Sequence, residues 1–419
     1  MSPLVVVVLI VLVDLLGFSI VMPLLAPFGK EYHFDGRQIG LLLAAYPMAQ
    51  LVAGPILGRL SDRFGRRPVL AASQAGTAIS FFILGFATDF TTMFLARLLD
   101  GASGGNILVA QAYVADVTKP ADRAKGYGLI GMAFGLGFVL GPILSMGLVS
   151  LPIAPEWRLR LPFLVAGGFS TIAWILVLAR LPESLPADAR ARQKARVVSL
   201  RGLADSVSMP IVGAMIALGS LVILGFAALE GTFSLYLEQR QGWGPVGVLG
   251  GFAFLGLVGA ATQGGLLRRL VPRFGEPKLI VAGLVLLIVG FVGLGWTSGT
   301  AAILASTLAV GIGQGLTTPS INGMLSKITP SREQGAVFGT LSSAQTLARM
   351  VNYVVANLLF GRGNTGAPFW MAAAIVLAAL GLALACLPVA ARRAEAVGSF
   401  SDQEGEPVPL AAGAEGFSA

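Results

Sequence analysis

The sequence predicts an all-α membrane protein in which twelve transmembrane helices form two pseudo-symmetric six-helix bundles. Of the 419 residues, 55% are hydrophobic and 12% are charged, whereas soluble domains carry about 25% charged residues. A helix needs about 20 mostly apolar residues to cross a bilayer. Twelve apolar runs of that kind follow one another, at residues 4–28, 37–58, 68–87, 91–116, 125–149, 160–180, 209–236, 246–267, 278–297, 301–325, 335–360 and 367–388.

The order of these runs predicts the domain organisation. Six runs make an N-terminal bundle over residues 1–180, and six make a C-terminal bundle over residues 209–390. The segment 181–208 between them is rich in Arg and is expected to be a cytoplasmic linker. Residues 391–419 combine acidic residues with Gly, Ala and Ser, a composition that is typical of a disordered tail.

The positions of the basic residues predict the orientation in the membrane. Of the 29 Lys and Arg residues, 21 fall in the segments on the side of both termini, six fall in the loops on the other side, and two lie within runs. Cytoplasmic loops carry an excess of Lys and Arg, so both termini are expected in the cytoplasm. The net charge of +8 therefore indicates orientation rather than a nucleic-acid partner.

Two pairs of loops repeat at one spacing, which indicates that the halves arose by duplication. The sequence R-F-G occurs at residues 63–65 and again at residues 273–275. The loops before the fifth and eleventh runs contain R-A-K-G from Arg123 and R-E-Q-G from Arg332, at nearly the same offset. Two six-helix halves related in this way place a substrate site at their interface, near the middle of the membrane.

Three motifs in the first half resemble those of the major facilitator superfamily, specifically its twelve-helix drug/proton antiporters of the tetracycline-efflux type. Residues 58–70 read G-R-L-S-D-R-F-G-R-R-P-V-L, which fits the cytoplasmic loop motif of that family at every defined position. The family's arginine motif reads R-L-L-D-G-A-S-G-G from Arg97. Its antiporter motif reads G-L-G-F-V-L-G-P-I-L-S-M from Gly135, with Ser145 and Met146 in place of the usual Gly-Gly.

The loop motif implies a gate at the cytoplasmic ends of the helices. A carboxylate among guanidinium groups can hold one half against the other through charge-assisted hydrogen bonds. The alternative is that these arginines only enforce orientation, although orientation does not require Asp62 or the glycines. The residues assigned to this gate are Gly58, Asp62, Arg63, Gly65, Arg66 and Arg67.

Asp14 lies about ten residues into the first run, close to the middle of the membrane. An ionised group there is costly unless it is paired, hydrated or protonated. Burial favours the neutral form of a carboxyl group, so a cycle of protonation becomes possible. We expect Asp14 to couple transport to protons, and the alternative is a structural hydrogen-bonding aspartate.

Arg97 and Asp100 are three residues apart in a helix, so they share a face and are able to pair. A proton that arrives at Asp100 would release Arg97, which would make the pair a switch. The resemblance assigns a role in proton transfer to Arg97, while Asp100 departs from the neutral residue that is more common there. The alternative is a static ion pair.

Further polar and aromatic side chains within the runs are candidates for the substrate cavity. The cation of Arg349 needs a carboxylate partner, and either Glu230 or Asp14 could supply it. Each of the other side chains could instead form an interhelical hydrogen bond or a packing contact. The predicted cavity residues are Glu230, Arg349, Gln111, Gln314, Gln345, Asn352 and Phe233.

The glycines of the fifth run predict a close helix contact. Gly137 and Gly141 are four residues apart, and small residues at that spacing let helices approach one another. Pro142 removes one backbone hydrogen bond and favours a kink. Close packing alone would explain these residues, and the resemblance adds a role in antiport.

Several classes of protein are excluded. The chain has one histidine, His33, and one cysteine, Cys386, so it lacks the ligands for a zinc or haem site and cannot form an internal disulfide. It contains no G-x-x-x-x-G-K-[ST] nucleotide-binding motif. We therefore expect no cofactor, no metal and no enzymatic activity, and any transport has to use a gradient.

These observations favour a secondary transporter that works by alternating access, with proton-driven export of a small, partly apolar compound as the expected function. A proton-coupled symporter or a facilitator of a nutrient is the first alternative, and a membrane receptor or scaffold is the second. The expected partners are the lipid bilayer, a small-molecule substrate and protons, with no obligate protein partner. The excess of Arg over Lys suggests a bacterial inner membrane.

Overall fold

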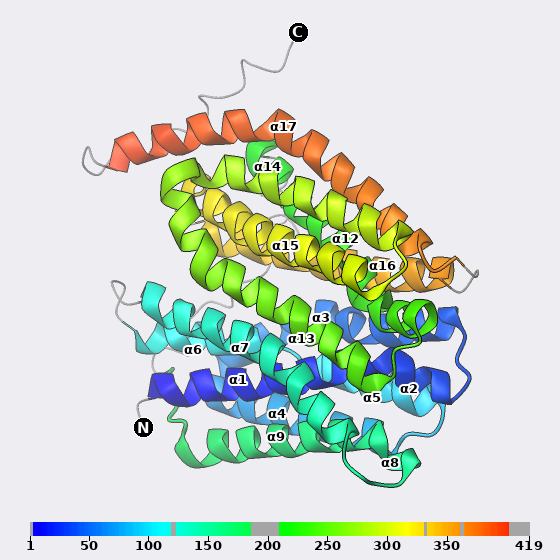
Figure 1. The fold of residues 1–419 in the computed structure, drawn as a ribbon. Helices are drawn as coiled ribbons and strands as arrows, with labels where there is room; N and C mark the ends of the chain where they lie inside the picture. Colours follow the sequence, from blue (N-terminus) through cyan, green and yellow to red (C-terminus); the bar gives the residue numbers. More distant parts are fainter. Residues whose placement is uncertain (1–2, 119–122, 186–208, 331–332, 361–363, 402–419) are drawn as a thin grey trace.

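The chain folds into a helical protein with two halves (Figure 1). The computed structural model describes residues 3–118, 123–185, 209–330, 333–360 and 364–401. The first half contains α1 (Pro3–Val21), η1 (Met22–Leu24), α2 (Leu25–Glu31), α3 (Gly36–Phe64), α4 (Arg66–Phe86), α5 (Phe90–Ser103), α6 (Asn106–Val117), α7 (Arg123–Val149), α8 (Pro155–Arg158) and α9 (Arg160–Arg180). The second half contains α12 (Pro210–Gln241), α13 (Pro245–Ala261), η3 (Thr262–Leu266), α14 (Leu267–Trp296), α15 (Thr300–Ile328), α16 (Gln334–Phe360) and α17 (Ala367–Ser401).

The helices confirm the twelve predicted runs. Nine helical stretches among the described residues are long and apolar enough to cross a membrane, and one of them, Pro245–Trp296, contains two of the predicted runs. The run 91–116 is divided into α5 and α6, which are too short to qualify singly, by Gly104 and Gly105. The remaining run corresponds to α16, which carries several polar residues.

The duplicated R-F-G sequence has the same backbone conformation in both halves. Gly65 separates α3 from α4 with a φ of 108°, and Gly275 interrupts α14 with a φ of 74°. Only glycine adopts such a conformation without strain. The repeat found in the sequence therefore marks corresponding turns at one end of each half.

The C-terminal tail differs from its prediction at its start. Helix α17 continues through Ser401, so residues 391–401 are helical and not disordered. The sequence A-A-R-R-A-E-A at this point consists of strong helix formers, which extend the helix past the apolar run. The rest of the predicted tail lies outside the described residues, as does most of the predicted linker, of which residues 181–185 are described.

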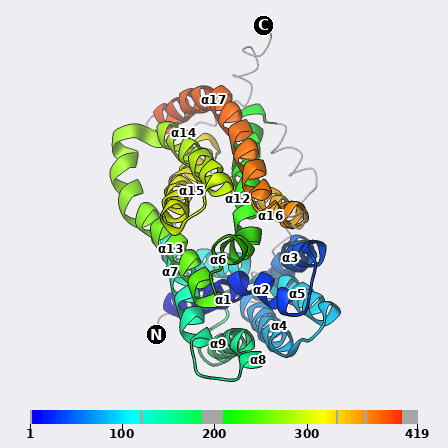
Figure 2. The ribbon, with the colours of Figure 1, turned by 45° about the vertical axis from the view of Figure 1, so that its right-hand side comes forward.

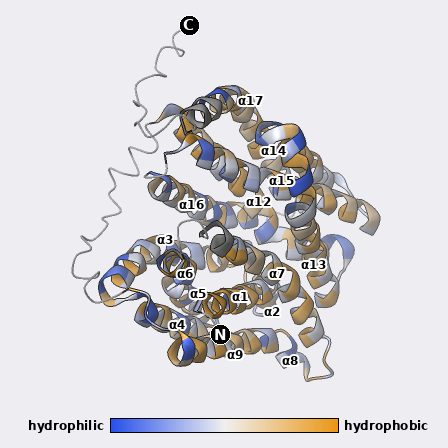
Figure 3. Ribbon diagram, turned by 90° about the vertical axis from the view of Figure 1, so that its left-hand side faces the viewer, coloured by the Kyte–Doolittle hydropathy of each residue, from blue (hydrophilic) through white to orange (hydrophobic). Residues whose placement is uncertain are grey.

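The halves meet through two pairs of helices. In Figure 2, α3 lies beside α16 and α7 lies beside α13, and both pairs pack together along the interface. Figure 3 looks along the helices from the side of the N-terminus and shows that apolar residues dominate most of them. Charged groups that lie between the halves are therefore placed in a largely apolar surrounding.

One end of the interface is closed by contacts between the halves. We call the end with Gly65 and Gly275 the arginine-rich end, and the end with α2 and α8 the opposite end. At the opposite end, α2 packs against α12, and Lys30 Nζ lies 3.5 Å from Glu238 Oε1. Leu43 of α3 is 1% exposed and faces Gly231 of α12.

We expect the Lys30 to Glu238 ion pair to keep the opposite end closed. In a protein whose Cys386 is replaced by Ala, a Leu43→Cys residue reports opening through its rate of maleimide labelling. Exposed ion pairs contribute about 1 kcal/mol or less, so Lys30→Ala should speed labelling up to about fivefold. The exchange Lys30→Glu with Glu238→Lys should restore the slow rate, and an unchanged rate in Lys30→Ala would contradict the role of the pair.

Candidate functional site

Asp14 is held by two amide side chains in the first half. Gln74 Nε2 of α4 donates to Asp14 Oδ1 at 3.4 Å, and Asn106 Nδ2 of α6 donates to the same oxygen at 3.1 Å. Both amide side chains are buried, and their own oxygen atoms have no hydrogen-bond partner in the described part of the protein. Three helices thus converge on one carboxylate in the membrane interior.

Gln74 and Asn106 are not among the site residues expected from the sequence. Amide groups within apolar runs were the available signal, and Asn106 also follows the two glycines that divide α5 from α6. Such amides more often serve helix packing, so the sequence alone could not single out these two.

Arg97 and Asp100 of α5 form the predicted ion pair. Arg97 Nη1 lies 2.6 Å from Asp100 Oδ2, and the two side chains are 2% and 5% exposed. The guanidinium group also lies over the ring of Tyr46 on α3, 4.9 Å from its centroid. The pairing is confirmed, while its role as a switch stays a prediction.

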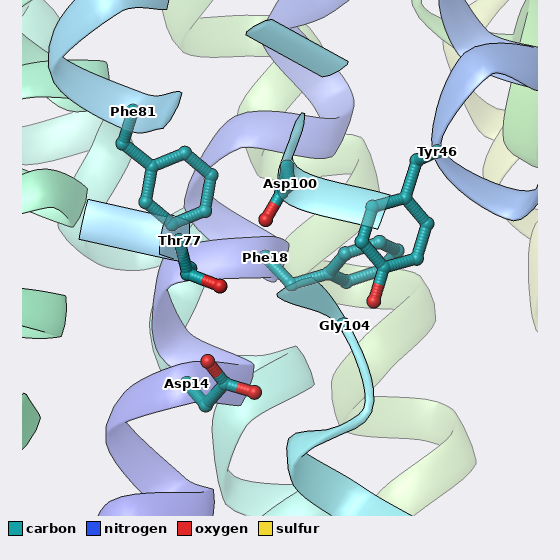
Figure 4. A pocket seen from close by; sticks show the side chains of 7 residues that line it. All are labelled: Asp14, Phe18, Tyr46, Thr77, Phe81, Asp100 and Gly104. Carbon is teal, nitrogen blue, oxygen red and sulfur yellow. The ribbon is translucent and has the colours of Figure 1, made fainter. Parts of the chain in front are cut away.

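A small cavity connects the two carboxylates of the first half (Figure 4). Asp14 and Asp100 both line it, together with Tyr46, Thr77 and the backbone at Gly104. Its volume is about 10 Å³, which is close to the least that a cavity needs to hold one water molecule. The carboxyl groups of Asp14 and Asp100 therefore border one polar space.

The second half has its own charged cluster. Arg349 Nε of α16 lies 3.2 Å from Glu230 Oε2 of α12, and the Tyr353 hydroxyl donates to the same oxygen at 3.0 Å. Glu230 is therefore the partner of Arg349, a question that the sequence left open. Tyr46, which lies against Arg97, is on α3, and α3 packs against α16, so the clusters of the two halves lie on helices that meet at the interface.

The other predicted cavity residues are not brought to these charges. Gln345 and Asn352 of α16 donate to backbone carbonyl groups of α12, at Gly219 and Leu224. Phe233 is 1% exposed and packs against Phe252 of α13.

Two further amide side chains, Gln314 and Gln111, stay predictions as cavity residues. Gln314 of α15 has a buried oxygen without a hydrogen-bond partner among the described residues. Gln111 is half-buried on α6. Neither is shown to contact the charged clusters.

The charges of the loop motif form a network within the first half. Arg66 pairs with Asp62 at 2.7 Å and with Asp116 of α6 at 3.2 Å. The backbone N–H groups of Arg66 and Arg67 donate to Glu183 at 2.8 and 3.2 Å. In this conformation the network joins α3, α4, α6 and the segment after α9, so contact with the second half stays a prediction for another state.

The remaining loop-motif residues contribute less to this network. Arg63 lies over the ring of Phe64, with 5.3 Å between its guanidinium carbon and the ring centroid. Gly58 has open space where a side chain would be, whereas Gly65 requires its positive φ. Asp116 and Glu183 were not expected from the sequence, because they lie far from the motif along the chain.

The glycines of α7 bring it close to α1. A Cβ at Gly141 would lie 2.0 Å from Ser19 Oγ, and one at Gly137 would lie 2.9 Å from Leu15 Cβ. Ser19 donates to the Gly137 carbonyl at 2.7 Å, and Ser145 donates to the Ile20 carbonyl at 3.0 Å. Pro142 lies within the helix beside this contact. Close packing is confirmed, and a role in antiport stays a prediction.

We expect Gly141→Val to destabilise the protein, because its side chain would overlap Ser19. Overpacking a tight contact costs about 1 to 3 kcal/mol. The matched control is Gly135→Val on the same helix, where a Cβ meets no atom within 4 Å. A lower melting temperature in detergent for Gly141→Val than for Gly135→Val confirms the contact, and equal melting temperatures contradict it.

Two six-helix halves with charged clusters on helices that meet at their interface define a membrane transporter. The chain matches the family model of the Major Facilitator Superfamily over residues 7–301 and 264–414. It belongs to this superfamily, and it is an integral membrane transporter rather than an enzyme.

Several characterised proteins are similar over most of their length. The class B tetracycline resistance protein of Escherichia coli is 28% identical over 86% of this chain and 88% of its own. Multidrug resistance protein 2 of Bacillus subtilis is 27% identical over 89% and 92%. The crystal structure of the human organic anion transporter MFSD10 (TETRAN) has a TM-score of 0.68 and 26% identity, and covers 91% of this chain and 98% of that one.

Proposed function

We propose that this protein exports a small, partly apolar compound from the cytoplasm in exchange for protons. The observation that carries the proposal is Asp14, a carboxylate in the membrane interior that borders a polar cavity with Asp100. A carboxylate neutralised by a proton cannot at the same time be neutralised by a cationic group of a substrate. Competition of this kind makes proton entry and substrate exit alternate, which is antiport.

The similar proteins support the direction of transport. The tetracycline and multidrug resistance proteins are named for resistance, and removal of a compound from the cell is the way in which a membrane transporter produces resistance. The excess of basic residues at the arginine-rich end supports its cytoplasmic location. We place the protein in a bacterial inner membrane with both termini in the cytoplasm.

Alternating access would follow from rocking of the halves about the pairs α3 with α16 and α7 with α13. The contacts of the opposite end, including Lys30 with Glu238, would separate when that end opens. The charges of the loop motif would then approach the second half and close the arginine-rich end. Asp14 and Asp100 would thereby be exposed to the two sides of the membrane in turn.

Inverted membrane vesicles test this function. In such vesicles the cytoplasmic face is outside, and the lumen is loaded with acid. Addition of tetracycline or another compound from a drug panel should make the lumen more alkaline, because each substrate that enters exchanges with a proton that leaves.

The other outcomes identify the alternatives. Substrate-dependent acidification of the lumen would indicate a symporter, and accumulation without a pH change would indicate a facilitator. Absence of protein-dependent flux for every compound, with the protein shown to be folded, would indicate a receptor or scaffold. Each of these results would contradict antiport.

A further inference from the structure

The guanidinium group of Arg349 has hydrogen-bonding capacity that the protein does not use. Arginine carries five N–H donors, four of them on its two terminal amino groups. The ion pair of Arg349 with Glu230 is made by Nε. Among the described residues, the terminal amino groups of Arg349 make no hydrogen bond.

The exposure of Arg349 indicates where these donors point. Its side chain is 40% exposed although it lies near the middle of α16, whereas Asn352 and Tyr353, which follow it, are 2% and 4% exposed. Arg349 lies one helical turn before Tyr353, whose backbone oxygen is 3.0 Å from the position of a Cβ on Gly40 of α3. Because α16 packs against α3, Arg349 lies on a part of α16 that borders the first half.

The carboxylate of Glu230 is less available to a ligand than the terminal amino groups of Arg349. It is 15% exposed, and one of its oxygen atoms accepts the Tyr353 hydroxyl and faces Arg349. Glu230 thus compensates the charge of Arg349 from the Nε side, at 3.2 Å. The fork formed by the two terminal amino groups is left for a ligand that enters between the halves.

We propose that Arg349 binds an oxyanionic group of the transported compound, such as a carboxylate, a phenolate or an enolate. A guanidinium group binds two oxygen atoms of such a group through parallel hydrogen bonds. This proposal rests on the proposed function, in which Asp14 on the other half takes either a proton or a cationic group. The substrate class that satisfies both sites is an amphoteric, largely apolar compound.

A matched pair of dyes tests the assignment. An aminoxanthene dye with a free benzoate is amphoteric, and its methyl ester is a cation of nearly the same shape. Fluorescence anisotropy measures their binding to the purified full-length protein in detergent, without a gradient. We expect the free acid to bind at least about tenfold more tightly, which corresponds to one good charged contact.

The net charge of the site, taken alone, would favour the opposite result. The charges cancel in each of the two ion pairs, Arg97 with Asp100 and Arg349 with Glu230. An ionised Asp14 therefore gives the site a net negative charge. A negative site on its own favours the cationic ester. A preference for the acid therefore requires a directed contact such as the one assigned to Arg349.

Variants identify the residue. Arg349→Gln together with Glu230→Gln removes both charges at nearly constant volume and should abolish the preference for the acid. Arg349→Lys keeps the positive charge but lacks the two terminal amino groups, and this variant should retain part of the preference for the acid. Arg240→Gln, which changes an arginine bonded to Thr365 and the Trp296 carbonyl, should leave the preference unchanged.

Three results would overturn the assignment: equal affinities for acid and ester in the unchanged protein, failure of the acid to bind, or a full preference in the double variant. The vesicle assay distinguishes failure of the proposed antiport from failure of the Arg349 assignment. If protons are not exchanged but the acid preference depends on Arg349, antiport is wrong and the Arg349 site stands.

Discussion

We expect Asp14→Asn to reduce proton-coupled transport to the level of vesicles without the protein, while folding is preserved. Asparagine has nearly the same volume, and its amide oxygen can accept hydrogen bonds from Gln74 and Asn106 as the carboxylate does. It cannot be protonated or ionised near neutral pH, so the exchange of a proton for a cationic group is lost. The measurement is substrate-triggered alkalinisation of inverted vesicles.

The matched control for this variant is Asp89→Asn. Asp89 is an exposed N-cap whose side chain accepts from the Thr92 N–H at 2.9 Å, and asparagine caps helices equally well. Asp89→Asn should transport as the unchanged protein does. Normal alkalinisation by Asp14→Asn would show that Asp14 is a structural aspartate.

The second large effect concerns the buried pair of α5. Asp100→Asn should destabilise the protein by about 3 to 5 kcal/mol, because it leaves the charge of Arg97 buried without its partner. Replacing both residues, as Arg97→Gln with Asp100→Asn, removes both charges and should restore most of the melting temperature. Together with Arg97→Gln and the unchanged protein, these two variants complete a double-mutant cycle that measures the energetic coupling of the pair.

Transport by the double variant then tests the switch. If a proton at Asp100 releases Arg97, the folded double variant should bind substrate and yet fail to alkalinise vesicles. Intact coupling in that variant would show that the pair is static. Stability and coupling are measured on the same preparation, so a folding defect cannot be mistaken for a lost switch.

The fold was predictable because membrane crossing imposes a strong pattern on the sequence. Apolar runs gave the helices, the basic residues gave an expected orientation, and the repeated R-F-G located the corresponding turns at Gly65 and Gly275. The start of the tail was wrong, since composition alone did not reveal that α17 continues through Ser401.

The site was predictable only where its residues share a helix. Three-residue spacing predicted that Arg97 pairs with Asp100. The choice of Glu230 over Asp14 as the partner of Arg349 depends on how α12 packs against α16, which one sequence does not specify. The same reason explains why the amide donors to Asp14 were missed and why Phe233 was assigned to the cavity although it packs in the core.

In the proposed mechanism, substrate and proton compete for Asp14. The most direct test is a measurement of proton release when substrate binds to the purified protein in weakly buffered detergent solution, at several pH values between about 5 and 8. We expect release of about one proton for each substrate bound in the unchanged protein and none in Asp14→Asn. Release that persists in Asp14→Asn, or no release at any of these pH values, would contradict it.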